Sequence, residues 1–364
     1  MSLFRASIAD LVPYEPGKPV EEVQRELGLE RVVKLASNEG PFPPFPAALE
    51  AIERAQHDLT RYPDGGVFRL RAALAERHGV AFEEVVVGGG ADGVIDLLSQ
   101  ATLDPGDEIV CGWPSFPSYV LDALKLGATP VKVPLRDHVY DLDALAAAVG
   151  PRTKLVYLCH PNNPTGTANG RAELRAFVER MPEHVLTVVD QAYFEYIDDP
   201  EYADAVAELF KAGLRVAVLR TFSKIYGLAG LRVGYGIAPA DVVAATSKVR
   251  RAFDVTAPAQ AAALASLDAH DELARRRELN AAGRERLAEI LRAHGLEPVP
   301  SLGNFLYADV GDGRDLFERL LREGVIVRPL GGFGAPGAIR VTVGTPEENE
   351  LFAVALGHVL SGVS

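Results

Sequence analysis

The sequence predicts an α/β protein with a large domain, built on a mostly parallel seven-stranded sheet covered by helices, and a smaller α+β domain. Short, continuous apolar runs alternate with helical patterns between about residues 67 and 237. Uninterrupted apolar strands are typical of parallel sheets that are buried on both faces. After residue 257 the rhythm of the pattern changes, and 364 residues are enough for one large domain and one smaller domain.

The elements follow in chain order. Residues 1–45 are rich in proline, which predicts an irregular arm that belongs to the small domain and adds no strand of its own sheet. In the large domain, residues 46–257, we expect helices at 67–78, 93–102, 118–126, 142–149 and 171–180, and strands at 85–87, 108–111, 129–133, 154–158, 185–189, 215–219 and 232–237. In the small domain, residues 258–364, we expect a long helical stretch at 258–294, strands at 305–309, 325–328 and 339–343, and helices at 315–322 and 346–360.

The composition argues against several classes of function. With 37 basic and 50 acidic residues the net charge is −13, so neither nucleic acid nor an anionic membrane is expected as the main partner. No stretch approaches the roughly 20 apolar residues that cross a bilayer, and the N-terminus lacks the apolar segment of a signal peptide. Cys111 and Cys159 each end an apolar run, as reduced core cysteines of a cytoplasmic protein do. The eight histidines show no metal-binding spacing, so no metal is expected.

One lysine has an unusual setting. Lys224 closes the segment Thr221-Phe222-Ser223-Lys224, directly after the apolar run 216–219, and Arg232 follows within the glycine-rich run 227–235. Lysine is usually a surface residue, so its position among small hydroxyl residues and glycines suggests a chemical role. Taken alone, the segment is equally consistent with a solvated lysine after an edge strand.

A glycine-rich loop, residues 88–93, lies between an expected strand and an expected helix. Its G-x-G-x-x-G pattern is typical of dinucleotide binding, which would make the chain a nicotinamide dehydrogenase. That interpretation requires an acidic residue at the end of the next strand, where the chain has Gly112, Trp113 and Pro114. Backbone N–H groups at a helix N-terminus also bind other phosphates, and this interpretation is favoured over a plain tight turn.

Further polar and aromatic residues follow the expected strands. Asn163 lies in the loop 161–166, which two prolines and a glycine constrain, and Asp190 caps the apolar strand 185–189. A carboxylate there requires a partner, such as a protonated pyridine nitrogen, although it could also cap the next helix. Phe116 could stack on a flat ring or pack in the core. Arg328 and Arg340 could bind an anionic substrate or form structural ion pairs.

Taken together in chain order, these segments resemble the fold-type I enzymes that use pyridoxal 5′-phosphate (PLP), the aspartate aminotransferase superfamily. Within it they are most similar to the histidinol-phosphate aminotransferases. The resemblance covers essentially the whole chain, with matches at residues 11–17, 34–39, 61–65, 90–92, 161–166, 190–193, 221–224, 227–232 and 339–345.

The resemblance implies a role for each matching residue. Lys224 would hold PLP as a Schiff base, and Asp190 would pair with the pyridine nitrogen of the cofactor. Tyr193 and Asn163 would bind the phenolic oxygen of the ring, and Phe116 would stack on it. The residues around the phosphate would be Ala91, Asp92, Thr221, Ser223 and Arg232, together with Tyr62 from the partner subunit of a homodimer. The residues on the substrate side would be Tyr14, Asn38, Arg328 and Arg340.

The implied reaction is the reversible transamination of L-histidinol phosphate with 2-oxoglutarate in histidine biosynthesis, with Lys224 as base and then acid. Two residues depart from the family pattern. Gly40 stands where asparagine is common, and Gly93 stands where an acidic residue often follows Asp92. Aromatic-amino-acid aminotransferases and threonine-phosphate decarboxylases carry much the same cofactor residues, so they stay open as alternatives. A non-catalytic regulator would require a DNA-binding extension, for which the chain has no room.

Overall fold

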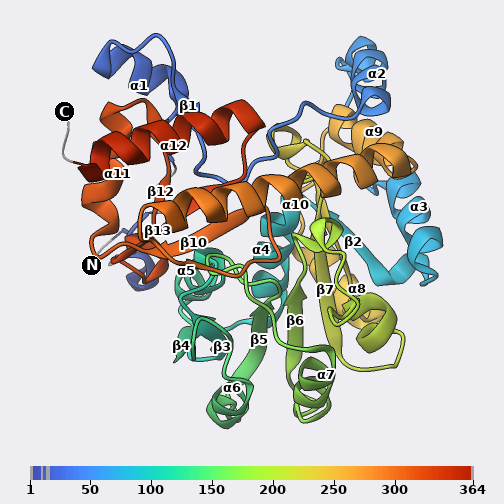
Figure 1. The fold of residues 1–364 in the computed structure, drawn as a ribbon. Coiled ribbons are helices and arrows are strands. Elements are labelled where there is room, and N and C mark those ends of the chain that lie inside the picture. The colour runs from blue at the N-terminus through green and yellow to red at the C-terminus, as the bar shows by residue number, and fades with distance from the viewer. Residues whose placement is uncertain (1–2, 10, 14–16, 362–364) are drawn as a thin grey trace.

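The computed structural model describes residues 3–9, 11–13 and 17–361. Figure 1 shows a large body around a central sheet and a smaller body that contains the C-terminal part of the chain. Tyr14, which the sequence predicts as a substrate-binding residue, lies outside the described residues.

The large body is built on a seven-stranded sheet with the order β2-β8-β7-β6-β5-β3-β4. Strand β8 runs antiparallel to its neighbours β2 and β7, and all other neighbouring pairs are parallel. The predicted fold class is therefore confirmed. The strands are β2 (Val85–Gly88), β3 (Glu108–Trp113), β4 (Thr129–Pro134), β5 (Thr153–Cys159), β6 (Leu186–Asp190), β7 (Val216–Thr221) and β8 (Gly234–Ile237).

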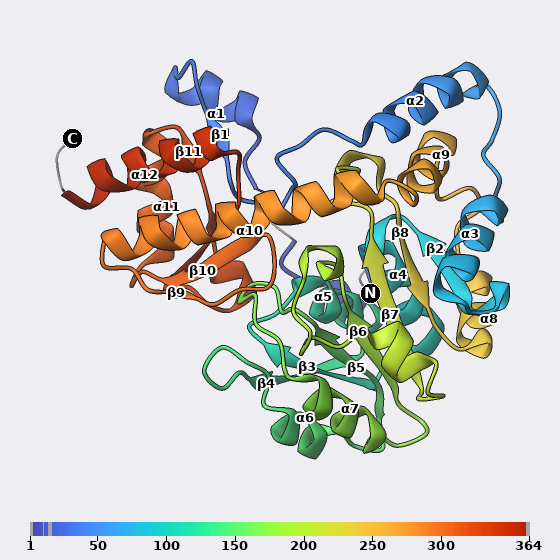
Figure 2. The ribbon, with the colours of Figure 1, turned by 45° about the vertical axis from the view of Figure 1, so that its right-hand side comes forward.

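Helices cover both faces of this sheet. Helix α4 packs with α5 and α8 in one layer, whereas α6 packs with α7 in another (Figure 2). The helices of this part are α2 (Pro46–Ala55), α3 (Phe68–His78), α4 (Gly90–Thr102), α5 (Pro117–Leu126), α6 (Leu142–Ala148), α7 (Arg171–Glu179), α8 (Ala240–Val249) and α9 (Ala257–Ser266). Short turns of 3-10 helix lie at Ala6–Ile8, Gln56–Asp58, Phe82–Glu84, Phe194–Tyr196, Ala229–Leu231 and Gly331–Phe333, and a π-helix lies at Val206–Phe210.

The smaller body contains an antiparallel sheet with the order β12-β13-β10-β9 and a two-stranded parallel sheet of β1 and β11. Its strands are β1 (Val33–Lys34), β9 (Pro298–Val299), β10 (Phe305–Asp309), β11 (Val325–Ile326), β12 (Arg328–Pro329) and β13 (Ala338–Thr342). Its helices are α1 (Val20–Leu27), α10 (His270–Ala293), α11 (Gly313–Arg322) and α12 (Pro346–Ser361).

Two expectations about local structure are wrong. The arm is not irregular throughout, because it forms α1, and Val33 pairs with Val325 in a parallel ladder. The expected helical stretch 258–294 is two helices, α9 and α10, that are separated at residues 267–269. Helix α9 packs on α2 and α3 of the large body, whereas α10 continues to α12 of the smaller one (Figure 1). One straight helix could not follow both directions.

The chain has two main apolar cores. One surrounds the seven-stranded sheet and includes Val188 and Phe222, and the other joins residues of the arm, such as Val23, to Leu287 and Phe352. The domain boundaries after residues 45 and 257 stay a prediction. In the described part of the chain, no helix combines the length and the apolar character needed to span a bilayer.

Candidate active site

A cavity of about 280 Å³ lies where the carboxyl ends of β5, β6 and β7 face the smaller body. Most of the residues that the sequence predicts for a site line this one cavity. They are Asn38, Ala91, Asp92, Phe116, Asn163, Asp190, Tyr193, Thr221, Ser223, Lys224, Arg232, Arg328 and Arg340.

The register of the parallel strands explains how the large-domain residues meet. Cys159 at the end of β5 pairs with Asp190 at the end of β6, and Asp190 pairs with Leu219 near the end of β7. Loops that leave these strands therefore begin at one edge of the sheet, where ligands of open α/β sheets bind. Tyr193 and Lys224 each follow the last residue of their strand by three positions.

The amine of Lys224 is held inside the cavity. Its Nζ donates a hydrogen bond to the carbonyl oxygen of Ser37 at 3.3 Å and lies 5.6 Å from the centre of the Tyr193 ring. Burial, together with the positive charge of Arg340, lowers the pKa of Lys224 to about 8. Because burial disfavours the charged form, this amine can lose and regain a proton near neutral pH.

Asp190 is a buried carboxyl with two hydrogen-bond donors. Tyr119 Oη donates to Oδ2 at 2.7 Å, and the backbone N–H of Ala192 donates to Oδ1 at 3.1 Å. Burial raises the pKa of Asp190 to about 6, and these hydrogen bonds oppose the shift. A cationic group on the cavity side would stabilise the carboxylate further.

One end of the cavity is suited to an anion. Thr221 Oγ1 lies 3.1 Å from Ser223 Oγ, and Arg232 Nη1 donates to Ser223 Oγ at 3.4 Å. A Cβ on Gly90 would lie 2.9 Å from Arg232 Nη2, and one on Gly234 would lie 2.3 Å from the amide nitrogen of Ala91. The glycines therefore allow the N-terminus of α4 to approach the guanidinium and β8 closely. Hydroxyls, a guanidinium and a helix N-terminus together form a phosphate-type cradle.

Asn38 and Tyr193 connect the arm to the large domain. Asn38 Nδ2 donates to Tyr193 Oη at 2.9 Å, and Thr342 Oγ1 bonds both the backbone N–H and Oδ1 of Asn38, at 3.0 and 3.1 Å. Asn38 is buried and has a φ of 53°, a left-handed conformation that asparagine tolerates better than most residues. The phenol of Tyr193 is buried, which raises its pKa.

The opposite end of the cavity is cationic. Arg340 is buried, donates through Nη2 to the carbonyl oxygen of Ala36 at 2.7 Å, and donates through Nη1 to Oδ1 of Asn163. Arg328 stands opposite Arg340 in the antiparallel ladder of β12 and β13, and both guanidiniums lie 5.4 Å from the centre of the Phe333 ring. Two guanidiniums at one end and Arg232 at the other suit a ligand or ligand pair with an anionic group at each end.

Tyr62 is not brought to the cavity of its own chain. Its side chain is 81% exposed and stacks on Phe253, with ring centroids 4.6 Å apart.

Three residues of the site were not predicted from the sequence: Tyr119, the partner of Asp190; Ser37, the acceptor of Lys224; and Cys159, which lines the cavity. Tyr119 lies three residues after Phe116, on the first turn of α5, so this spacing was the available signal.

Proteins with similar sequences and structures agree with this geometry. The pattern of the family described as "Aminotransferase class I and II" matches residues 30–356. The histidinol-phosphate aminotransferase of Anaeromyxobacter sp. is 47% identical over 99% of this chain and 100% of its own length, and that of Moorella thermoacetica is 44% identical over 98% and 93%.

Among solved structures, the histidinol-phosphate aminotransferase of Sinorhizobium meliloti in complex with pyridoxal-5′-phosphate superposes with a TM-score of 0.92. It is 31% identical and covers 100% of this chain and 99% of its own. These similarities confirm the resemblance to the fold-type I enzymes. This chain belongs to the class I and II aminotransferases.

Proposed function

We propose that this chain is a PLP-dependent aminotransferase that transfers the amino group of L-histidinol phosphate to 2-oxoglutarate, giving imidazole-acetol phosphate and glutamate. One observation carries the proposal: Lys224, Asp190 and the Thr221–Ser223–Arg232 cradle face one cavity of about 280 Å³. The names of relatives that are similar over nearly the whole chain support the choice of substrate.

The residues present fit PLP. The cradle at the N-terminus of α4 would hold its phosphate. The carboxyl of Asp190 would pair with the ring nitrogen, whose positive charge would oppose the effect of burial on this acid. Phe116 and Ala192 line the cavity beside these groups, while Tyr193 and Asn163 offer hydrogen bonds to an oxygen on the ring. When bound, PLP supplies an electron sink for the negative charge that develops at the substrate Cα.

Lys224 would carry the proton of the reaction. An amine with a pKa near 8 is neutral often enough to remove a proton from the substrate Cα, and it can return that proton as an acid. Asp190 would remain ionised beside a protonated ring nitrogen, and Tyr119 would hold its carboxylate in place. The arm covers the cavity through Ser37 and Asn38, which helps to exclude water from the reacting atoms.

Arg340 and Arg328 would bind the anionic end of the substrate, with Tyr14 as a further predicted contact. Guanidinium groups donate forked pairs of hydrogen bonds to both phosphate and carboxylate oxygens. The same pair can therefore serve the phosphate of histidinol phosphate and a carboxylate of 2-oxoglutarate in turn. The hydrogen bonds of Arg340 to Asn163 and Ala36 fix its orientation before substrate arrives.

The purified protein should be yellow, and its visible band should shift when histidinol phosphate is added. Comparing kcat/KM for histidinol phosphate, phenylalanine and tyrosine with 2-oxoglutarate tests the substrate. A preference for phenylalanine would replace the proposal by an aromatic-amino-acid aminotransferase, and release of CO₂ from threonine phosphate would indicate a decarboxylase. Membership of the aminotransferase family removes the support for a nicotinamide dehydrogenase.

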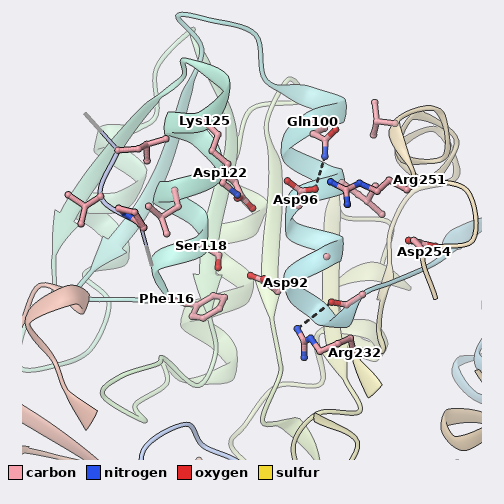
Figure 3. Close-up of a pocket in the computed structure, with 18 residues that line it drawn as sticks. Asp92, Asp96, Gln100, Phe116, Ser118, Asp122, Lys125, Arg232, Arg251 and Asp254 are labelled. Atoms are coloured by element: carbon pink, nitrogen blue, oxygen red, sulfur yellow. Dashed lines mark hydrogen bonds and ion pairs between the residues drawn. The ribbon is translucent and has the colours of Figure 1, made fainter. Parts of the chain in front are cut away.

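We also propose a homodimer in which Tyr62 of one subunit completes the phosphate site of the other. A second hollow, of about 890 Å³, shares Asp92, Phe116 and Arg232 with the cavity, so the phosphate end is open on this side (Figure 3). Tyr62 is available elsewhere on the surface, where Leu59 and Phe68 are also more than half exposed. A second copy would cover these apolar side chains and fill the hollow.

Hybrid dimers test this arrangement. Tyr62→Ala and Lys224→Ala subunits, each poor on its own, should form a mixed dimer with one native site, since the Lys224→Ala subunit supplies Tyr62 to the intact lysine. On mixing, we expect recovery of about a quarter to a half of the wild-type rate. Subunits that each carry both substitutions should recover no activity. A monomer in sedimentation experiments would contradict the proposal.

The cytoplasm is the proposed location. A biosynthetic reaction that uses the metabolites glutamate and 2-oxoglutarate supports it, and so do the buried thiols of Cys111 and Cys159, which are both free. Fractionation of cells with an antibody against the chain would test the location.

A further inference from the structure

Three consecutive arginines on the second turn of α10 have different surroundings. Arg276 is buried, Arg277 is partly buried, and Arg275 is exposed. Helix α10 crosses from the large body to the smaller one (Figure 2): Leu273 packs on the core of the large sheet, whereas Leu287 and Ile290 belong to the second core. These arginines therefore lie where the helix passes the carboxyl edge of the sheet.

The guanidinium of Arg276 joins three parts of the chain. Nη1 donates to the carbonyl oxygen of Ile225 at 3.0 Å, Nη2 donates to that of Pro43 at 2.7 Å, and Nε donates to Glu272 Oε1 at 2.8 Å. Its centre also lies 4.3 Å from the centre of the Phe45 ring. Ile225 follows Lys224 directly, so this one side chain ties the lysine turn and the arm to α10.

The arm also packs closely on the lysine turn. A Cβ on Gly227 would lie 3.0 Å from the carbonyl oxygen of Pro43, and one on Gly40 would lie 3.1 Å from that of Lys224. The turn is thus held between the arm and the fork of Arg276. This close approach gives a physical reason for glycine at position 40.

Arg277 holds the other loop at the cavity. Its Nε donates to the carbonyl oxygen of Glu195 at 2.9 Å, and Glu195 lies in the 3-10 turn Phe194–Tyr196 that starts directly after Tyr193. The ladder between β6 and β7 ends at Asp190 and Leu219, and Thr221 pairs with β8, but Tyr193 and Lys224 lie beyond these ladders. Adjacent residues of one helix therefore fix the two loops relative to each other.

We propose that Arg276 and Arg277 are positioning residues, which act through backbone carbonyls to set Lys224 relative to Tyr193 in the cavity that both residues line. The inference rests on the proposed function, because the geometry matters only if Lys224 acts in a reaction. A displacement of about 1 Å at a reacting group can cost on the order of 100-fold in rate, so loss of these anchors should be visible in kcat.

The chain offers a matched control. Arg275 bonds the same Glu272, through Nε and Nη2 at 2.8 Å each, and its guanidinium lies 5.3 Å from the Phe42 ring, against 5.5 Å for Arg276. Within the described part of the chain, Arg275 makes no hydrogen bond to either loop. Arg275→Met therefore removes a charge, a Glu272 partner and a Phe42 neighbour but leaves the loop anchors in place.

The test compares Arg276→Met, Arg276→Lys, Arg277→Met and Arg275→Met with the wild type. In the PLP-loaded enzyme, Arg276→Met should lower kcat about tenfold or more with KM within about threefold, Arg276→Lys should recover part of the loss, and Arg275→Met should match the wild type. In the cofactor-free protein, amide hydrogen exchange of the peptide covering 222–228 should be about tenfold faster in Arg276→Met only.

A lower melting temperature in Arg276→Met, with kcat and the exchange of residues 222–228 unchanged, would overturn the inference and leave a structural role. If Arg276→Met does not fold, Arg277→Met decides, because its partner loop should exchange faster at residues 193–197 and kcat should fall. An Arg277→Met variant in which neither the exchange of residues 193–197 nor kcat changes also overturns the inference. Failure of the proposed function would look different: the wild type itself would not transaminate, while the exchange differences would persist.

Discussion

The cofactor end and the substrate end of the cavity are assembled in different ways. Asp190 and Thr221 end neighbouring strands that ladder register brings together, and Ser223 and Lys224 follow within three residues of the strand end. The substrate end joins segments that are far apart in sequence: Asn38 bonds Thr342, and Arg340 bonds Ala36, each across 304 residues. The first arrangement is set by local topology, and the second depends on the arm and the small domain docking correctly.

This difference predicts different responses to substitution. A change at the cofactor end should remove chemistry and leave the fold intact, because the sheet is stabilised by its own apolar core. A change at the substrate end should affect binding and the docking of the arm together. The following substitutions, from the largest expected effect to the smallest, test this separation.

Lys224→Ala should have the largest effect. It removes the only group that we assign to proton transfer at the substrate Cα, so kcat should fall by at least about 1,000-fold. The cofactor-free protein should not be destabilised at pH 7, because the amine makes one long hydrogen bond, at 3.3 Å to Ser37, and its lowered pKa shows that burying its charged form costs stability. Stopped-flow measurement of the first half-reaction checks the rate. Turnover above a tenth of the wild-type value would show that another base serves the reaction.

Asp190→Asn should separate activity from stability. The pKa of Asp190 is about 6 in the fold against an ordinary 3.8, so the folded state binds more protons between these values. Stability of the cofactor-free protein should therefore fall as pH rises from about 4 to about 6 and stay level above that. Asp190→Asn removes this loss, so at pH 8 it should be more stable by on the order of 3 kcal/mol, with no gain at pH 3.

The same variant should lose activity about 100-fold or more, because a neutral amide cannot keep the ring nitrogen protonated. Urea unfolding at pH 4, 6 and 8 measures the stability change, and transamination of the PLP-loaded form measures activity. Equal stability of the variant and the wild type at pH 8 would show that the buried carboxyl has a cationic partner even without cofactor.

The two ends also differ in how far the sequence predicts them. Asp190, Asn163 and Lys224 follow apolar runs of parallel-strand character, so their meeting at one edge could be expected from pattern alone. Asn38 could be named only through a family resemblance, because no local pattern shows that residue 38 approaches residue 342. For Arg340 the pattern left substrate binding and a structural ion pair both open. Tyr119 was missed for another reason: its ring belongs to an aromatic core pair with Tyr157, and only its hydroxyl reaches Asp190.

The lack of a local sequence signal also explains why two elements of the fold were predicted wrongly. The arm looked irregular because its strand, β1, has two residues and exists only through pairing with β11, almost 300 positions away. The break between α9 and α10 contains neither proline nor glycine, and it arises from the direction in which each helix packs. Long-range packing decided both cases, and local propensity carries no signal of it.

Arg340→Met should test the substrate end. Charge-assisted hydrogen bonds contribute about 1.5–3 kcal/mol each, so kcat/KM should fall on the order of 100-fold, mostly through KM for both substrates. Stability should also fall, by about 1–3 kcal/mol, because Asn163 Oδ1 and the carbonyl oxygen of Ala36 lose a buried donor. Arg286→Met, at an exposed arginine that pairs with Glu289 and Glu350, is the control and should change neither.

For Arg340→Met, the affinity for PLP decides whether the two ends act separately. Equilibrium titration of the cofactor-free variant should give a dissociation constant for PLP within about threefold of the wild type, since the substitution leaves the phosphate cradle and the hydrogen bonds of Asp190 in place. Loss of PLP binding with intact substrate affinity would mean that Arg340 serves the cofactor end.

Tyr119→Phe should have the smallest effect and the clearest pH signature. Removing the hydroxyl takes one donor at 2.7 Å from the carboxylate of Asp190 and leaves the ring stack with Tyr157, whose centroids are 4.4 Å apart. Because that donor stabilises the ionised form, the pKa of Asp190 should rise further, and the acidic limb of the kcat profile should move to higher pH.

We expect about a tenfold loss of kcat for Tyr119→Phe at pH 6 and a smaller loss at pH 8, where the carboxyl is ionised in both enzymes. Tyr157→Phe is the matched control. Its hydroxyl bonds Ser99 at 3.1 Å instead of Asp190, so its pH profile should follow the wild type. An acidic limb that moves equally in both variants would assign the effect to aromatic packing and not to the carboxylate. A shift in Tyr119→Phe alone would show that the hydroxyl of Tyr119, on α5, lowers the pKa of Asp190. Strand register would then place Asp190 but would not by itself set its charge.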